Sequence, residues 1–120
     1  MRIEIENEDT ESLHKAMQLL FEPTEYGIPR RYNTPVTAWK GKELVGAIVT
    51  LLRDNEITIV THVDHRFEGI ATAMLVALER LDEDFHAIAG SEGGAAALWA
   101  LAYRLGRIPR NISWAGYDQE

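Results

Sequence analysis

The residues best suited to chemistry lie between Thr58 and Leu78, where a run of β-branched residues gives way to a helical pattern. The segment that joins the two patterns contains Gly69, followed two positions later by Ala71. Small residues at the point where a strand passes into a helix allow the backbone to approach a bulky anion closely. The first turn of the helix then offers unpaired N–H groups and the positive end of its dipole. The spacing therefore predicts a cradle for a phosphate or pyrophosphate group.

Three residues of this segment, Arg66, Gly69 and Ala71, fit the pattern Gln/Arg-x-x-Gly-x-Gly/Ala. In this respect the segment resembles motif A of the GNAT superfamily of N-acetyltransferases. The four residues before it, His62 to His65 (H-V-D-H), are similar to the H-P-D-Y that often precedes the motif in that family. The strand before the pattern and the helix after it supply the context that the motif requires.

The resemblance implies that acetyl-CoA is a co-substrate and that its acetyl group passes directly to a primary amine. In the family, the motif strand and the next strand splay apart, and the pantetheine arm pairs with exposed backbone in the gap. By position, the backbone of Val60 and Thr61 would bind the arm, and the amides from Phe67 to Thr72 would hold the pyrophosphate. The cofactor-binding residues implied in this way are Val60, Thr61, Arg66, Phe67, Glu68, Gly69, Ile70, Ala71 and Thr72.

The last predicted helix departs from the family pattern, which often carries Asn, then Ala, then Leu-Tyr four residues before Gly-Phe. When Gly106 is aligned with that glycine, Leu101 matches, but Ala102 occupies the tyrosine position and Ala95 the asparagine position. Arg107 replaces the phenylalanine. The tyrosine that often protonates the departing thiolate is therefore missing from its usual place.

Two residues are the catalytic candidates. Tyr103 is one position from the family's tyrosine, about 100° around the helix, and is taken either as the thiolate acid or as a packing residue. Glu25 is taken as the base that deprotonates the incoming ammonium, and Tyr26 and Tyr32 belong to the same loop, where an acceptor would lie. A strand amide near Thr61 would stabilise the oxyanion. The acceptor is either a small amine or a protein amino group.

The pair His62 and His65 with Asp64 also has the residue types of a two-His-one-carboxylate metal site. The predicted mixed architecture argues against one, so His62 is expected to be bonded locally, His65 to line the loop, and no metal to bind. Trp39 and Trp99 are expected in the core.

Composition bounds the remaining classes. With 120 residues, 46% hydrophobic, the chain is expected to form a single domain over 1–120 with its own core. A net charge of −7 disfavours nucleic-acid binding, and no apolar run approaches the roughly 20 residues that a membrane span needs. The absence of cysteine excludes disulfides and thiolate sites and fits a cytoplasmic location. Whether the protein forms a homodimer stays open.

Positive charge recurs near both ends of the second half of the chain, at Arg66, Arg104, Arg107 and Arg110. These arginines either converge on an anionic substrate or are separately solvated, and the sequence allows both.

Periodicity predicts a mixed α/β fold in which an antiparallel meander precedes a parallel β-α-β unit. The expected strands cover 2–5, 36–40, 43–52, 57–62, 85–89 and 112–117. A first helix, capped by Asp9 or Thr10, would end at Pro23, and further helices would cover 69–81 and 92–105. The stretch from Pro23 to Pro35 is expected to be loop. This order resembles the GNAT core, with splayed strands.

Two other functions stay open beside the enzyme. One is a non-catalytic acyl-CoA-binding or protein-interaction module on a GNAT scaffold, which the missing tyrosine and asparagine favour. The other is a small acidic interaction protein that shares the topology and mimics an anionic partner, which the net charge of −7 favours.

Overall fold

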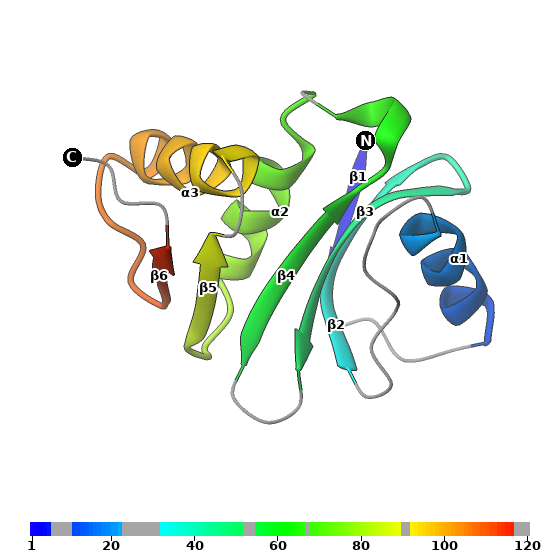
Figure 1. Cartoon of the computed structure of the whole chain (residues 1–120), viewed down its shortest axis with the longest axis horizontal. Coiled ribbons are helices and arrows are strands. Elements are labelled where there is room, and N and C mark those ends of the chain that lie inside the picture. The colour runs from blue at the N-terminus through cyan, green and yellow to red at the C-terminus, as the bar shows by residue number, and fades with distance from the viewer. Residues whose placement is uncertain (6–10, 23–31, 52–54, 67, 90–91, 117–120) are drawn as a thin grey trace.

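The computed structural model describes residues 1–5, 11–22, 32–51, 55–66, 68–89 and 92–116, which form one mixed sheet with helices on both faces (Figure 1). The elements in chain order are β1 (Arg2–Ile5), α1 (Glu11–Phe21), β2 (Tyr32–Lys40), β3 (Glu43–Leu51), β4 (Glu56–Thr61), the 3-10 turn η1 (Val63–His65), α2 (Ile70–Glu79), β5 (Phe85–Ala89), α3 (Glu92–Leu105) and β6 (Ile112–Gly116). None of the helices in this described part is long and apolar enough to cross a membrane.

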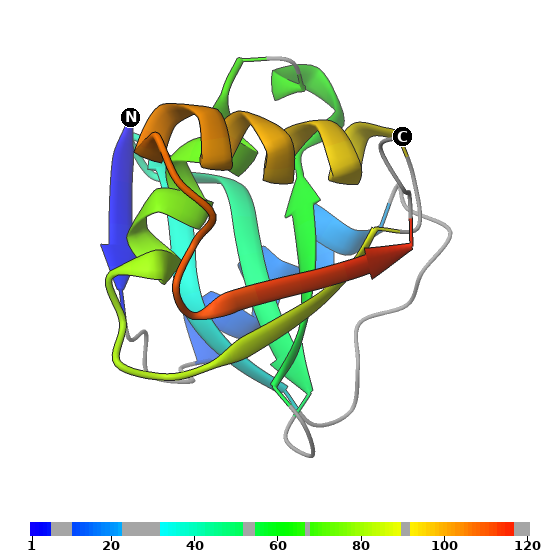
Figure 2. The same cartoon turned by 90° about the vertical axis from the view of Figure 1, so that its left-hand side faces the viewer.

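The strands follow one another across the sheet in chain order, β1-β2-β3-β4-β5-β6. The first four form an antiparallel meander, whereas β4 with β5 and β5 with β6 are parallel pairs. The two parallel connections are made by α2 and α3, which lie on the same side of the sheet, and Figure 2 shows α3 running alongside β6, above β5 and β6 in this view. The predicted mixed α/β class and the parallel β4–β5 pair are therefore confirmed.

Each face of the sheet has its own hydrophobic layer. The strands alternate in the direction of their side chains, so one set of residues meets α1 and the other meets α2 and α3. The α1 layer consists of Leu13, Met17, Leu20, Phe21, Leu44, Ala47, Val49 and Val60. The larger layer is built around Met74, Leu75 and Leu78 of α2 with Leu98 and Leu101 of α3, all at most 1% exposed.

Strand β2 begins earlier than the sequence predicts. Tyr32 to Pro35 were expected in the loop, because proline removes a backbone donor from a sheet. Tyr32 and Asn33 instead pair with Leu51 and Thr50 of β3, and the register shifts by one residue between Asn33 and Val36. That bulge places Pro35 where no regular ladder bond is required.

Glycine at position 46 of β3 lets α2 approach the sheet closely. A Cβ at Gly46 would lie 2.9 Å from Cγ2 of Ile70 and 3.0 Å from Cε of Met74. Ile70 is the first residue of α2 and Met74 lies one turn later. The contact therefore fixes how near the beginning of this helix lies to β3.

Asn111 ties the other end of α2 to β6. Its side-chain Nδ2 lies 2.9 Å from the Leu81 carbonyl oxygen and 2.8 Å from that of Glu83. Its backbone carbonyl also accepts a hydrogen bond from the Phe85 amide at 2.7 Å. Through these bonds one residue, by its side chain and its backbone, holds the connection that follows α2 and the start of β5 in place.

Two of the four arginines of the sequence pattern lie at this same end. Arg107 donates to Oε1 of Glu79 at 2.7 Å, and Nε of Arg110 lies 3.7 Å from the same oxygen. Glu79 ends α2, so these two arginines are placed at the opposite end of the helix from Arg66. The possibility that all four arginines converge on one anion is therefore wrong, because Arg107 and Arg110 balance the Glu79 carboxylate, whose side chain is 6% exposed.

The hydrogen bond from Arg107, reinforced by the charges of Arg107 and Arg110, holds the pKa of Glu79 below its ordinary value of 4.5. A carboxylate with a lowered folded-state pKa stabilises the fold at pH values above its unfolded pKa. That contribution is lost as the pH falls through the lowered value. Acidification below about 4.5 should therefore weaken the junction between α2 and the segment after α3.

We expect Gly46→Ala to lower the free energy of unfolding by about 1–3 kcal/mol, because the added methyl group overpacks against the first turn of α2. Urea unfolding measures this. In an Ile70→Ala background, which lacks the Cγ2 group, the same substitution should cost less. Equal costs in both backgrounds would show that α2 does not press on Gly46.

We expect Glu79→Gln to lower the free energy of unfolding by about 1–2 kcal/mol at neutral pH, through loss of charge-assisted hydrogen bonds. The difference from the unsubstituted protein should shrink when urea unfolding is repeated at progressively lower pH, because Glu79 then becomes protonated and loses its charge. Glu83→Gln removes an equal charge from an exposed neighbour and should show neither effect. A pH-independent difference would contradict the assignment.

Candidate functional site

The parallel strands β4 and β5 separate before either one ends. Their register pairs are Glu56 with His86 and Ile57 with Ala87, although β4 continues to Thr61. Figure 1 shows the two strands diverging toward their C-terminal ends, with α2 seen between them and α3 above the tip of β5. In the described part of the chain, the C-terminal half of β4 therefore has a ladder on its β3 side alone.

The hydrogen-bond pattern shows which backbone groups of β4 face the separation. The His62 amide donates to the Val45 carbonyl at 2.8 Å, so the bonded pairs with β3 occur at every second residue back from His62. The backbone N–H and C=O groups of Val60 consequently point toward Ala47 of β3. The backbone N–H and C=O groups of Ile59 and Thr61 point the other way, toward β5. The backbone of Thr61 faces the separation, as expected for a residue that binds the pantetheine arm. The backbone of Val60 faces β3 instead, and the second residue whose backbone faces the separation is Ile59.

After β4 the chain makes the single turn η1 and then enters α2 at Gly69. Gly69 has φ of +80°, a left-handed conformation that glycine adopts without strain. A Cβ built at Gly69 would meet no atom within 4 Å. The conformation and the open space therefore both lie where the sequence predicts an anion cradle.

The first amide of α2 that bonds within the helix is that of Ala73, which donates to the Gly69 carbonyl at 3.0 Å. The amides of Ile70, Ala71 and Thr72 precede it and have no carbonyl within the helix to bond. They point out of the helix at its positive end, where an anion is stabilised. Ile70 is 2% exposed and packs inward, so its side chain does not cover these amides.

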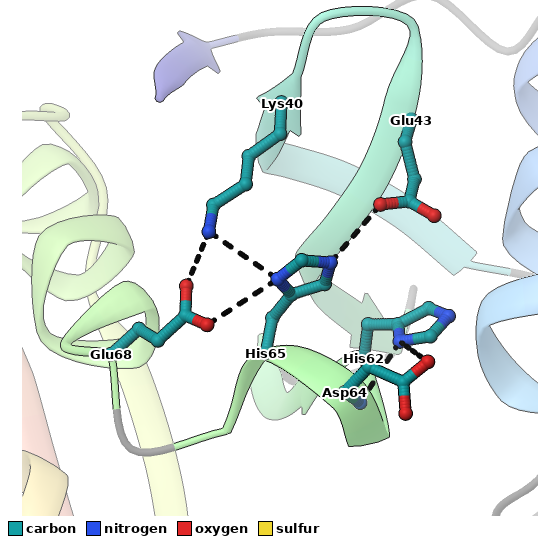
Figure 3. Close-up of polar contacts among 6 residues, drawn as sticks. All are labelled: Lys40, Glu43, His62, Asp64, His65 and Glu68. Carbon is teal, nitrogen blue, oxygen red and sulfur yellow. Dashed lines mark hydrogen bonds and ion pairs between the residues drawn. The ribbon is translucent and has the colours of Figure 1, made fainter.

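Four side chains from two different parts of the chain meet beside the connection between β4 and α2 (Figure 3). Lys40 and Glu43 flank the turn of the β2–β3 hairpin, and His65 and Glu68 belong to the connection between β4 and α2. The Lys40 ammonium bonds Oε1 of Glu68 and lies 3.3 Å from Nδ1 of His65. Nε2 of His65 lies 3.1 Å from Oε1 of Glu43. The hairpin is thus linked to the residue immediately before Gly69.

The charges in this group act on Glu68. The hydrogen bond from Lys40 is the largest cause, and the charge of Lys40 adds to it, so the pKa of Glu68 is lowered from 4.5. Glu68 is therefore ionised at neutral pH. A carboxylate stands beside the predicted anion cradle, with Lys40 as its counter-ion.

The two histidines have defined hydrogen-bond roles. Nδ1 of His62 accepts a bond from the Asp64 amide at 3.1 Å, which leaves the proton of the neutral ring on Nε2. An ammonium only donates, so Nδ1 of His65 accepts from Lys40 and its Nε2–H donates to Glu43. The prediction that His62 is bonded locally and that His65 lines the loop is confirmed. Among the described residues, no group of three His, Asp or Glu side chains could hold a metal ion.

The final helix orients the tyrosine candidate away from the core. Ala102, at the position where the family pattern has tyrosine, is 8% exposed, whereas Tyr103 is 90% exposed. Tyr103 is therefore not a packing residue. Trp99 is 40% exposed and contacts Trp114 edge-to-face at 5.6 Å, so its expected place in the core is wrong. Trp39 does pack against the α1 layer.

The other predicted site residues are placed as follows. Arg66 is exposed just before the cradle, and Thr72 is half-buried in the first turn of α2. Phe67, Glu25 and Tyr26 lie outside the described residues. Tyr32 is a strand residue whose hydroxyl lies 3.2 Å from Nδ1 of His14.

Sequence reasoning missed Lys40, Glu43 and Gly46. Lys40 and Glu43 flank a predicted two-residue turn, where charged residues are ordinary, and no local pattern connects them to residues 25 positions later. Gly46 carries a weak signal, since a glycine inside a strand often marks close approach by another element.

Comparison of the whole chain with protein-family models, with curated proteins and with solved structures gives no match. The residues and their geometry therefore carry the functional argument by themselves.

The ring protonation described above predicts that both His62 and His65 are Nε2–H tautomers when neutral. Long-range ¹H–¹⁵N correlation spectra at about pH 8 read the tautomer directly. Lys40→Met removes the donor to His65, so its ring should then shift toward the Nδ1–H form that faces Glu68, while His62 stays unchanged. A wild-type His65 already protonated on Nδ1 would contradict the assigned contacts.

Proposed function

We propose that this chain is an N-acetyltransferase of the GNAT type, which moves the acetyl group of acetyl-CoA to a primary amine. The observation that carries the proposal is a coincidence of position. The Arg66-x-x-Gly69-x-Ala71 pattern leads into α2 through Gly69, whose φ is left-handed, and it follows a strand that separates from its parallel neighbour, with the turn η1 between them. Each feature suits a different part of the same substrate.

The pyrophosphate of acetyl-CoA would be held by the amides of Ile70, Ala71 and Thr72. These are the donors that the helix leaves unpaired, and the open space over Gly69 gives the phosphates room. The pantetheine arm contains amide groups that pair with a strand edge. The backbone of Ile59 and Thr61 supports such pairing, since it faces the side on which β5 has moved away.

The chemistry that follows is direct transfer. The nitrogen of a neutral amine attacks the thioester carbonyl carbon, and the carbonyl oxygen becomes an oxyanion that the Thr61 amide would stabilise. Collapse of this intermediate breaks the carbon–sulfur bond and releases the CoA thiolate. The proton lost by the nitrogen passes to a base, for which Glu25 is proposed, and Tyr103 is proposed to protonate the thiolate. The acceptor is a small amine or a protein amino group.

A second candidate is a module that binds acyl-CoA on the same scaffold without turning it over. The exposure of Tyr103 at 90% favours this alternative, because a thiolate acid needs to approach the sulfur atom inside the separation of the strands. The small buried side chain of Ala102 supplies no proton in its place.

Calorimetric titration with acetyl-CoA tests the proposal. We expect micromolar binding to the unsubstituted protein and a loss of at least about 100-fold for Gly69→Glu, which places a side chain and a negative charge in the cradle. Gly106→Glu is the matched control, because Gly106 also has a left-handed φ, +71°, and a Cβ there would meet nothing within 4 Å. It should carry the same backbone strain and charge without affecting binding.

Absence of binding to a protein shown to be folded by circular dichroism would overturn the proposal. Equal losses for the two glycine variants would also overturn it, since the effect would then come from strain or net charge. Binding without release of CoA thiol over a panel of amines would favour the non-catalytic module.

A further inference from the structure

Lys40 is the cationic side chain that the tertiary structure brings to the start of α2, and it comes from the β2–β3 hairpin. We propose that Lys40 is a phosphate-binding residue of this site and that the Glu68 carboxylate occupies its ammonium group until the substrate's pyrophosphate replaces it. This inference rests on the proposed function. It adds a residue from outside the motif and assigns a role to an acidic residue inside it.

The placement of the pair supports the exchange. Glu68 immediately precedes Gly69, so its carboxylate and the unpaired amides of α2 belong to one short segment. Lys40 reaches this segment from the end of β2 and bonds Glu68 directly (Figure 3). A pyrophosphate bound at the amides would therefore lie near the ammonium of Lys40 and near the negative charge of Glu68.

Solvent exposure makes the pair exchangeable. The side chains of Lys40 and Glu68 are each 40% exposed. Ion pairs at such positions contribute little to stability, because water and salt screen them. A pyrophosphate carries more charge than one carboxylate and has several acceptor oxygens, so it competes effectively for the same ammonium.

The other charges around the pair keep Lys40 in position when Glu68 is displaced. Nδ1 of His65 lies 3.3 Å from the Lys40 ammonium, and Nε2 of His65 is held by Glu43 at 3.1 Å. Nδ1 of His65 also lies 3.4 Å from the second oxygen of Glu68. The neutral His65 ring thus offers Lys40 an acceptor that remains when the carboxylate moves away.

A purely structural role for the pair makes the opposite prediction for Glu68. If the Lys40–Glu68 contact served only to hold the cradle in shape, removal of either charge would weaken acetyl-CoA binding. If Glu68 is a counter-ion that the substrate displaces, removal of its charge strengthens binding. The sign of the effect at Glu68 therefore separates the two roles.

The experiment titrates acetyl-CoA and S-acetylpantetheine, a thioester without the pyrophosphate, into four variants. We expect Lys40→Met to weaken acetyl-CoA binding about threefold to tenfold, and Glu68→Gln to strengthen it by a similar factor. Binding of S-acetylpantetheine should change in neither variant. Lys42→Met is the control for Lys40→Met and removes the same charge from an exposed position in the same hairpin. Glu83→Gln is the control for Glu68→Gln and removes the same charge from an exposed position after the end of α2. Both controls should have little effect on acetyl-CoA binding.

Weaker acetyl-CoA binding by Glu68→Gln would overturn the inference and assign the pair a structural role. Effects of Lys40→Met no larger than those of Lys42→Met, or equal effects on the phosphate-free thioester, would overturn it as well. In these cases the wild-type protein still binds acetyl-CoA and the proposed function stands. If the wild-type protein binds no acetyl-CoA, the proposed function and this inference fail together.

Discussion

The close approach of α2 to β3 at Gly46 is the constraint on which the candidate site depends. A side chain at this position would collide with Ile70, the first residue of the helix. Because Gly46 pairs with Thr61 of β4, the same contact sets the beginning of α2 next to the end of that strand. The unpaired amides of the helix and the unpaired side of β4 are therefore held at a fixed distance from each other.

Polar contacts at the two ends of α2 complete this placement. At its beginning, the hairpin side chains of Lys40 and Glu43 contact Glu68 and His65 in the connection from β4. At its end, Glu79 is an unfavourable residue for the negative end of a helix dipole, and Arg107 offsets its charge. Asn111 bonds the carbonyl groups that follow. The helix is thus tied to the meander at one end and to the segment after α3 at the other.

Net charge and local charge act in opposite directions in this protein. The chain carries −7 overall, which repels a polyanionic substrate at long range. At the start of α2 the helix amides offer partial positive charge, and the Lys40 ammonium offsets the Glu68 carboxylate. Solvent screens the distant carboxylates more strongly than contacts at this position, so these short-range charges would dominate the interaction with a bound anion.

The sequence alone determined the order of the elements and the position of Gly69 at the start of α2. Alternation and helical spacing located β1, β5 and α3 within the bounds that the structure gives them. Gly69 was recognised because small residues between a strand and a helix form a local pattern, and the structure adds that its φ is +80°. The extended start of β2 was missed, since local reasoning excluded Pro35 from a strand and only pairing with β3 accommodates it.

The tertiary structure decided everything that depends on two distant segments. The direction of the β4 peptide groups follows from one bond, His62 to Val45, and this bond selects Ile59 rather than Val60. Exposure of Tyr103 follows from which side of α3 packs against α2. The meeting of Lys40 with Glu68 joins residues that no periodic pattern relates, because a hairpin turn and a strand-to-helix connection come together only when the sheet has formed.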